Sequence, residues 1–76
     1  MSDAQPQWLL DGRRRLGIRV RDARMHADLT QEELAHLSGV PRNSYQRIEH
    51  GTSDVKYSHL MRIAHALRLQ VRDLLP

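Results

Sequence analysis

Residues 30–51 read TQEELAHLSGVPRNSYQRIEHG, a pattern that predicts two short amphipathic helices joined by a tight turn. Thr30 and Glu33 have the spacing of a capping box, in which two residues satisfy each other's free backbone donors at the start of a helix. Gly39 can adopt the positive φ that ends such a helix. The expected helices therefore span about 30–38 and 42–50.

The spacing of apolar residues predicts which sides of these two helices are buried. Leu34 and Leu37 lie three residues apart and are expected to face the core together. In the second helix Tyr45, Ile48 and Glu49 share one side, and this side is expected to pack. The other side of the second helix is then left for solvent or for a ligand.

The outward side of the second helix is polar. Arginine can donate two hydrogen bonds to guanine, and asparagine or glutamine can pair with adenine, so a helix with this side suits the major groove of duplex DNA. An ordinary solvated helix surface is the alternative interpretation. The side consists of Arg42, Asn43, Gln46, Arg47 and His50.

The stretch LTQEELAHLSGVPRNSYQRIEHG resembles the helix-turn-helix of the XRE family, the phage-repressor type. LGIRVRDAR (residues 16–24) is similar to the first helix of that family, and LMRIAHALRLQVRDLL (residues 60–75) is similar to its last two. The resemblance implies an all-α, five-helix, phage-repressor-like domain that binds a specific sequence of double-stranded DNA and regulates transcription. The matching residues are Leu29, Thr30, Gln31, Leu34, Ala35, Gly39, Val40, Arg42, Ile48, Glu49 and Gly51.

The resemblance and the polar side together give a set of expected DNA contacts. The family pattern implies that Gln31 and His50 touch phosphates. Three residues depart from that pattern, because Asp28 replaces a glycine, Pro41 replaces a serine or threonine cap, and Tyr45 replaces a smaller aliphatic residue. The full expected set is Gln31, Arg42, Asn43, Ser44, Gln46, Arg47, His50, Thr52 and Lys56.

Further helices are expected before and after this pair. The first should span about 13–27, with Gly17 weakening it by about 1 kcal/mol relative to alanine. Another should span about 58–68, and a short last turn of helix should follow it. The inner side of the first helix is formed by Leu16, Val20 and Ala23.

Two charged residues lie on helix sides that are otherwise apolar. Arg24 follows Val20 by four residues, and Glu49 adjoins Ile48. An unpaired buried charge is costly, so Arg24 and Glu49 are expected to pair with each other, and the family resemblance implies the same link. This structural ion pair should fix the recognition helix against the first helix.

The composition predicts a single small domain. The chain has 76 residues, no cysteine and no long apolar run, so we expect neither disulfides nor a membrane-spanning helix, and we expect a cytoplasmic location. The net charge is +3, and six arginines between Arg13 and Arg24 favour a polyanionic partner. The expected division is an N-terminal tail with a short apolar segment (1–10) and a helix-turn-helix DNA-binding domain (11–76).

Neither catalysis, a cofactor nor a metal site is expected. None of the five histidines has the i, i+4 spacing that places two imidazoles on one side of a helix, and the serines lack a nucleophile motif. The alternative function is a protein-interaction module that uses the same fold with little or no DNA binding. The apolar residues Trp8, Leu9 and Leu10 are the feature that favours this alternative.

A homodimer on a pseudo-palindromic DNA site is expected, because one recognition helix contacts too few base pairs to select a site in a genome. The candidate interface is Val71, Leu74 and Leu75, with a contribution from Trp8, Leu9 and Leu10. The alternative role of these residues is to complete the core of the monomer. The sequence leaves open a phage-type repressor, a restriction-modification controller or an antitoxin with a toxin partner.

Overall fold

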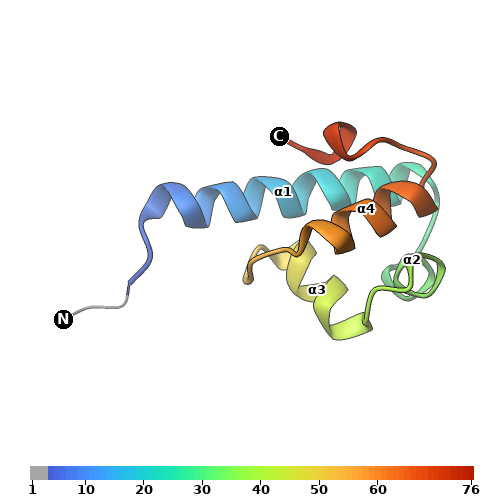
Figure 1. The fold of residues 1–76 in the computed structure, drawn as a ribbon, viewed down its shortest axis with the longest axis horizontal. Helices are drawn as coiled ribbons and strands as arrows, with labels where there is room; N and C mark the ends of the chain where they lie inside the picture. Colours follow the sequence, from blue (N-terminus) through green and yellow to red (C-terminus); the bar gives the residue numbers. More distant parts are fainter. Residues whose placement is uncertain (1–3) are drawn as a thin grey trace.

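The structure is a computed structural model that describes residues 4–76, and the regular elements in this range are all helical. They are α1 (Gln7–His26), α2 (Gln31–Ser38), α3 (Arg42–His50), α4 (Tyr57–Ala66) and a 3₁₀ turn, η1 (Val71–Leu74) (Figure 1). In the described part of the chain, no helix is long and apolar enough to cross a membrane.

The all-α class is confirmed, but the expected count of five α-helices is wrong. The described residues form four α-helices, and the last expected helix is the short turn η1. Arg68 has a left-handed backbone with φ 58° soon after α4, which reverses the chain. The Gln70 backbone N–H then donates to Asp73 Oδ2 at 2.9 Å. The helical turn that follows this Gln70 cap has only four residues, a length typical of 3₁₀ structure.

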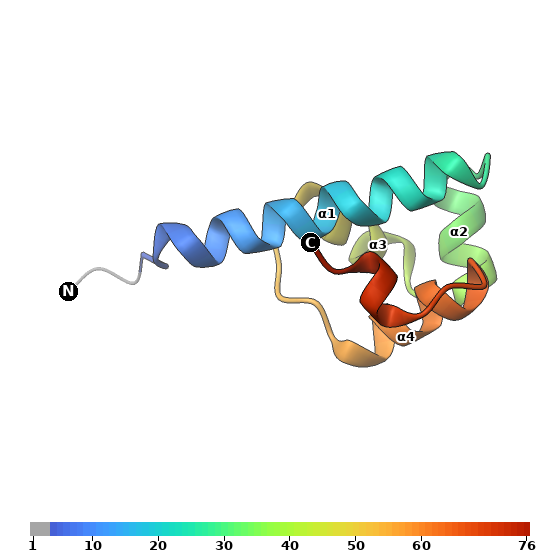
Figure 2. The same cartoon turned by 90° about the horizontal axis from the view of Figure 1, so that it is seen from above.

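The long helix α1 forms one edge of the molecule (Figure 2). In Figure 1, α3 lies below α1 and η1 lies above it. α1 packs against α3 and η1, α2 packs against α3 and α4, and α4 also packs against η1. The pair α2 and α3 is therefore held between α1 and α4.

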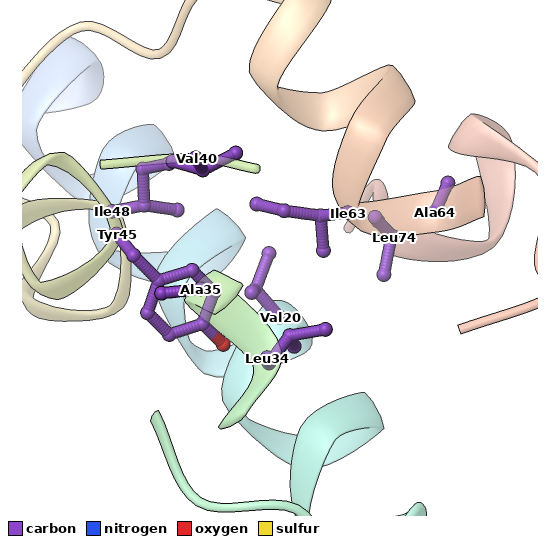
Figure 3. Close-up of a cluster of buried hydrophobic side chains, with 9 residues drawn as sticks. All are labelled: Val20, Leu34, Ala35, Val40, Tyr45, Ile48, Ile63, Ala64 and Leu74. Carbon is purple, nitrogen blue, oxygen red and sulfur yellow. The ribbon is translucent and has the colours of Figure 1, made fainter. Parts of the chain in front are cut away.

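The core receives side chains from all five elements (Figure 3). Each element must bury its apolar side against its neighbours, and in a domain of this size no two helices can do so alone. The elements are therefore expected to form together. The buried residues of this cluster are Val20, Leu34, Ala35, Val40, Tyr45, Ile48, Ile63, Ala64 and Leu74.

The expected start of the first helix at residue 13 is wrong, because α1 begins at Gln7. The carbonyl oxygen of Pro6 accepts hydrogen bonds from the backbone N–H groups of Leu9 and Leu10 at 3.0 and 3.3 Å. The apolar residues Trp8, Leu9 and Leu10 thus belong to the first turn of α1. The boundary expected between residues 10 and 11 falls within this helix.

The expectation that Leu37 is buried beside Leu34 is also wrong. Leu37 is 59% exposed, and the buried residues of α2 are Leu34, Ala35 and Ser38. Ser38 fits the core because its hydroxyl donates to the Ala35 carbonyl at 3.1 Å and accepts from the Val40 N–H at 3.3 Å. Ser38 can therefore be buried because both of its hydrogen bonds are formed, whereas the apolar pattern predicts that Leu37 is the buried residue.

Glycines set the distance between α1 and α3. A Cβ built on Gly17 would lie 2.5 Å from the carbonyl oxygen of Glu49 and 2.6 Å from that of Ile48. Gly51 follows α3 with φ 70°, and a Cβ there would lie 2.7 Å from Arg14 Cα. Gly17 therefore allows a close helix crossing, a role beyond the weakening of α1 that the sequence predicts.

We expect Gly17→Ala to destabilise the fold, although alanine favours a helix by about 1 kcal/mol over glycine. The added methyl group would overlap the backbone of α3, and overpacking of this kind costs about 1–3 kcal/mol. In a domain of this size each net kcal/mol lowers the melting temperature by roughly 4–8 °C. Thermal unfolding followed by circular dichroism measures the effect.

Gly12→Ala is the matched control, because Gly12 also lies within α1 and a Cβ there meets nothing within 4 Å. This variant should raise the melting temperature. Equal stability of the two variants would show that α1 and α3 do not approach each other as closely as described.

Candidate nucleic-acid interface

The structure brings Arg24 and Glu49 together. Arg24 Nε donates to Glu49 Oε2 at 2.7 Å, and Arg24 Nη2 donates to Glu49 Oε1 at 3.1 Å. The Tyr45 hydroxyl also donates to Oε2, and Gln31 Nε2 donates to Oε1 at 3.0 Å. The Glu49 carboxylate therefore accepts hydrogen bonds from α1, α2 and α3.

Hydrogen bonding and burial oppose each other in their effects on the pKa values of Glu49 and Arg24, but they act in the same direction on the pKa of Tyr45. Burial raises the pKa of Glu49, but hydrogen bonds from Arg24, Tyr45 and Gln31 outweigh burial and leave that pKa lowered. The hydrogen bond to Glu49 raises the pKa of Arg24. Burial, followed by the hydrogen bond to Glu49, raises the pKa of Tyr45 well above its ordinary value. At neutral pH the cluster is an ion pair with a neutral phenol.

Most of the expected DNA contacts lie on the outward side of α3 and on the segment that follows it. We call this set the recognition surface. Ser44 and Gln46 are half-buried, and the other members are exposed. Its members are Arg42, Asn43, Ser44, Gln46, Arg47, His50, Thr52 and Lys56.

Gln31, the remaining expected contact, is placed differently. It is half-buried at the start of α2, and its side-chain amide donates to Glu49. The amide is therefore already part of the cluster that anchors α3.

A hollow of about 220 Å³ lies between α3 and the start of α4. It brings together Ser44 and Arg47 of α3 with Lys56, and it is also lined by His59, which the sequence did not indicate as a site residue. His59 lies three residues beyond Lys56 on α4, so helical spacing from Lys56 was the signal that could have identified it.

Two ion pairs with exposed carboxylates were also absent from the sequence prediction. Arg42 Nη2 lies 2.6 Å from Glu32 Oε1, and both side chains are more than 60% exposed. Arg13 Nη2 of α1 lies 2.5 Å from Asp54 Oδ1 in the segment before α4. Arg13 and Asp54 are 41 residues apart, so no local spacing relates them.

The expected dimer surface at the C-terminal end needs a correction. Leu74 has no exposed surface and belongs to the core of the single chain. Val71 is half-buried against that core, whereas Leu75 is 46% exposed. The turn η1 packs against α1 and α4, so its apolar residues Val71 and Leu74 are covered within the single chain.

Comparisons with known proteins address the fold and the family. The family model HTH_3, helix-turn-helix, matches residues 20–74. The solved structure of the restriction-modification controller protein C.AhdI from Aeromonas hydrophila is 33% identical, with a TM-score of 0.80, and the match covers 83% of this chain and 96% of that one. A comparison with curated proteins finds no match.

Two further solved structures are similar. The clp gene regulator ClgR from Corynebacterium glutamicum is 32% identical, with a TM-score of 0.76, over 82% of this chain and 66% of that one. The hypothetical transcription factor NHTF from Neisseria is 26% identical, with a TM-score of 0.80, over 100% of this chain and 86% of that one.

Arg24→Ala should lower the free energy of unfolding by roughly 3–5 kcal/mol, because it leaves the Glu49 carboxylate buried without its cation. The Glu49 side chain is only 3% exposed, and the substitution also removes a 2.8 Å hydrogen bond from Arg24 to the Leu29 carbonyl. Chemical denaturation at neutral pH measures the loss.

Arg21→Ala is the control, because Arg21 is exposed on the same helix. Its effect should stay within about 0.5 kcal/mol. The difference in free energy of unfolding between wild type and Arg24→Ala should become smaller as the pH falls below about 4.3, the ordinary pKa of glutamate. A lowered pKa stabilises the fold above that value, and protonation of Glu49 removes this contribution. A gap that is small at neutral pH would contradict the anchoring role of Arg24.

Proposed function

The chain belongs to the HTH_3 helix-turn-helix family of DNA-binding transcriptional regulators, and we propose that it reads a specific DNA sequence by inserting α3 into the major groove. The observation that supports this proposal is that the two sides of α3 differ. Tyr45 and Ile48 are buried and Glu49 is anchored, while Arg42, Asn43 and other polar residues face outward. A helix held on one side and polar on the other suits readout of base edges.

Within this proposal, base contacts and phosphate contacts come from different parts of the recognition surface. Arg42, Asn43 and Gln46 lie in the first five residues of α3 and have the donors and acceptors that match guanine or adenine. Arg47 adds a further base or phosphate contact. The remaining members hold the duplex backbone and fix the register of the helix. Gln31 can join them, because its side-chain amide has a second N–H besides the one donated to Glu49.

Arg42 must leave Glu32 before it can reach a base. The Arg42 to Glu32 pair is exposed at both ends, and pairs of that kind contribute only about 0–1 kcal/mol. Arg42 can therefore exchange the Glu32 carboxylate for guanine or phosphate with little loss of free energy. The pair holds the arginine near the start of α3 until DNA arrives.

We further propose a homodimer that binds two half-sites about one helical turn, roughly 34 Å, apart. Similarity to a restriction-modification controller favours that role over a phage-type repressor or an antitoxin with a toxin partner. Action on DNA together with the absence of cysteine fits a cytoplasmic location. A protein-interaction module remains the second candidate, because Trp8 is 74% exposed.

DNA binding should weaken steeply with added salt, because each neutralised phosphate releases counterions and contributes a log-log slope of about −0.9. Lys56→Ala should lower the magnitude of the slope by roughly one unit and weaken all sequences alike. Fluorescence anisotropy with a labelled random duplex over a salt series measures both. Arg72→Ala is the control, because η1 lies across α1 from α3 in Figure 1. Affinity that does not change with salt would favour the protein-interaction module.

Gln46→Ala should relax sequence preference, because a lost bidentate base contact costs about 1–3 kcal/mol at one position of the site. Selection from a random DNA pool, applied to wild type and variant, measures the change in preference. Lys56→Ala is the comparison variant and should select the wild-type site. If Gln46→Ala and Arg42→Ala both select that site with undiminished discrimination, then α3 does not read the bases.

A further inference from the structure

One side of α1 carries a regular pattern of side chains that lie outside the core cluster, of which Asp11 is half-buried and the other three are exposed. Trp8, Asp11, Arg15 and Ile18 follow one another at spacings of three, four and three residues. Gly17 and Val20, which are buried, lie on the other side of the helix. Trp8 also lines a hollow of about 270 Å³ together with Leu16, Val55 and Leu60.

Spacings of three and four residues are those of a helix that packs along another helix. Trp8 is 74% exposed and Ile18 is 51% exposed, so the pattern places a large apolar side chain at each end. Asp11 and Arg15 lie between them. Asp11 accepts one hydrogen bond from Gln7 Nε2 at 2.9 Å, and among residues 4–76 no partner engages the Arg15 side chain.

The pattern is complementary to itself when it is reversed. In an antiparallel pair centred on residue 13, Trp8 faces Ile18 of the second copy, and Asp11 faces Arg15 of the second copy. Two identical antiparallel helices are related by a two-fold axis, here at residue 13, so each pair occurs twice, once on either side of that axis. We propose that this side of α1 binds a second copy of the chain in that antiparallel register.

Charge selects this register over its competitors. A parallel pair would place Asp11 against Asp11 and Arg15 against Arg15. An antiparallel pair centred between residues 16 and 17 would place Asp11 against Asp22, and like charges in facing positions are unfavourable. Of these three arrangements, the one centred on residue 13 pairs opposite charges and also brings the apolar ends together.

The contact is short, so it should be weak in the free protein. Trp8 and Ile18 are ten positions apart, about 15 Å along the helix. Stable interfaces bury far more surface than this one row of four side chains, which we call the seam. Arg14 lies beside the axis in both copies, and its self-repulsion weakens the contact further. Two protomers on adjacent half-sites would face each other at a high effective concentration, so the seam would add to affinity mainly on DNA. This use rests on the proposed homodimer.

Charge reversal tests the seam without DNA. Asp11→Arg places two arginines against two arginines, and Arg15→Asp places two aspartates against two aspartates, so each variant alone should dimerise roughly tenfold more weakly than wild type. A mixture of the two variants should form a heterodimer, because every facing pair is then opposite in charge. The double variant Asp11→Arg, Arg15→Asp should recover the wild-type homodimer. Sedimentation equilibrium measures all four, and circular dichroism confirms that each variant is folded.

Trp8 gives an independent signal, because it is the only tryptophan in the chain. Its emission should shift to shorter wavelength as wild-type protein is concentrated, and Asp11→Arg should move this shift to higher concentration. A dimer that is indifferent to both single reversals would overturn the seam and direct attention to the exposed Leu75, while leaving the proposed homodimer intact. A chain that stays monomeric in solution and on its selected DNA site would overturn both the seam and the homodimer.

Discussion

A carboxylate that is 3% exposed must be paired, and here the requirement of Glu49 ties three helices together. Arg24 reaches it from α1 and Gln31 from α2, while Tyr45 approaches from within α3. The backbone of the same residue meets α1 a second time, because the Glu49 carbonyl lies against Gly17. Gly17 and Arg24 are seven residues apart, about 10 Å along the helix, so α3 is held at two separated points. It can neither roll nor tilt without losing one of them.

This anchoring explains how a helix of only nine residues can present a fixed polar side. An isolated helix of that length is unstable in water, and here its stability comes from the buried side. The outward side is consequently free to be chosen for its chemistry. Arg42 is held by an exposed carboxylate that a duplex can displace at little cost, whereas Arg13 is 88% buried and holds Asp54 in place beside Lys56. The buried ion pair is thus the one between Arg24 and Glu49 that anchors α3, whereas both partners of the Arg42–Glu32 pair on the proposed DNA-binding side are exposed.

Local spacing was sufficient for the helix-turn-helix and for its family. The capping box between Thr30 and Glu33 is present with hydrogen bonds of 2.8 and 3.0 Å, and Gly39 adopts φ 74° at the end of α2. The assignment of Tyr45 and Ile48 to the buried side of α3 is confirmed as well. These features depend on residues within one or two turns of each other, where capping and periodicity determine the outcome.

Features that depend on distant residues were not accessible in this way. Leu37 fits an apolar stripe of α2, yet the neighbouring stripe that contains Ser38 faces the core, and the position of α3 and α4 decides between the two. The close approach at Gly17 and the pair between Arg13 and Asp54 each join positions more than 30 residues apart. Such contacts set how the helices are oriented, whereas local patterns set where they occur. The residues proposed to contact DNA can therefore be named from the sequence, but the angle at which α3 presents them follows from tertiary packing.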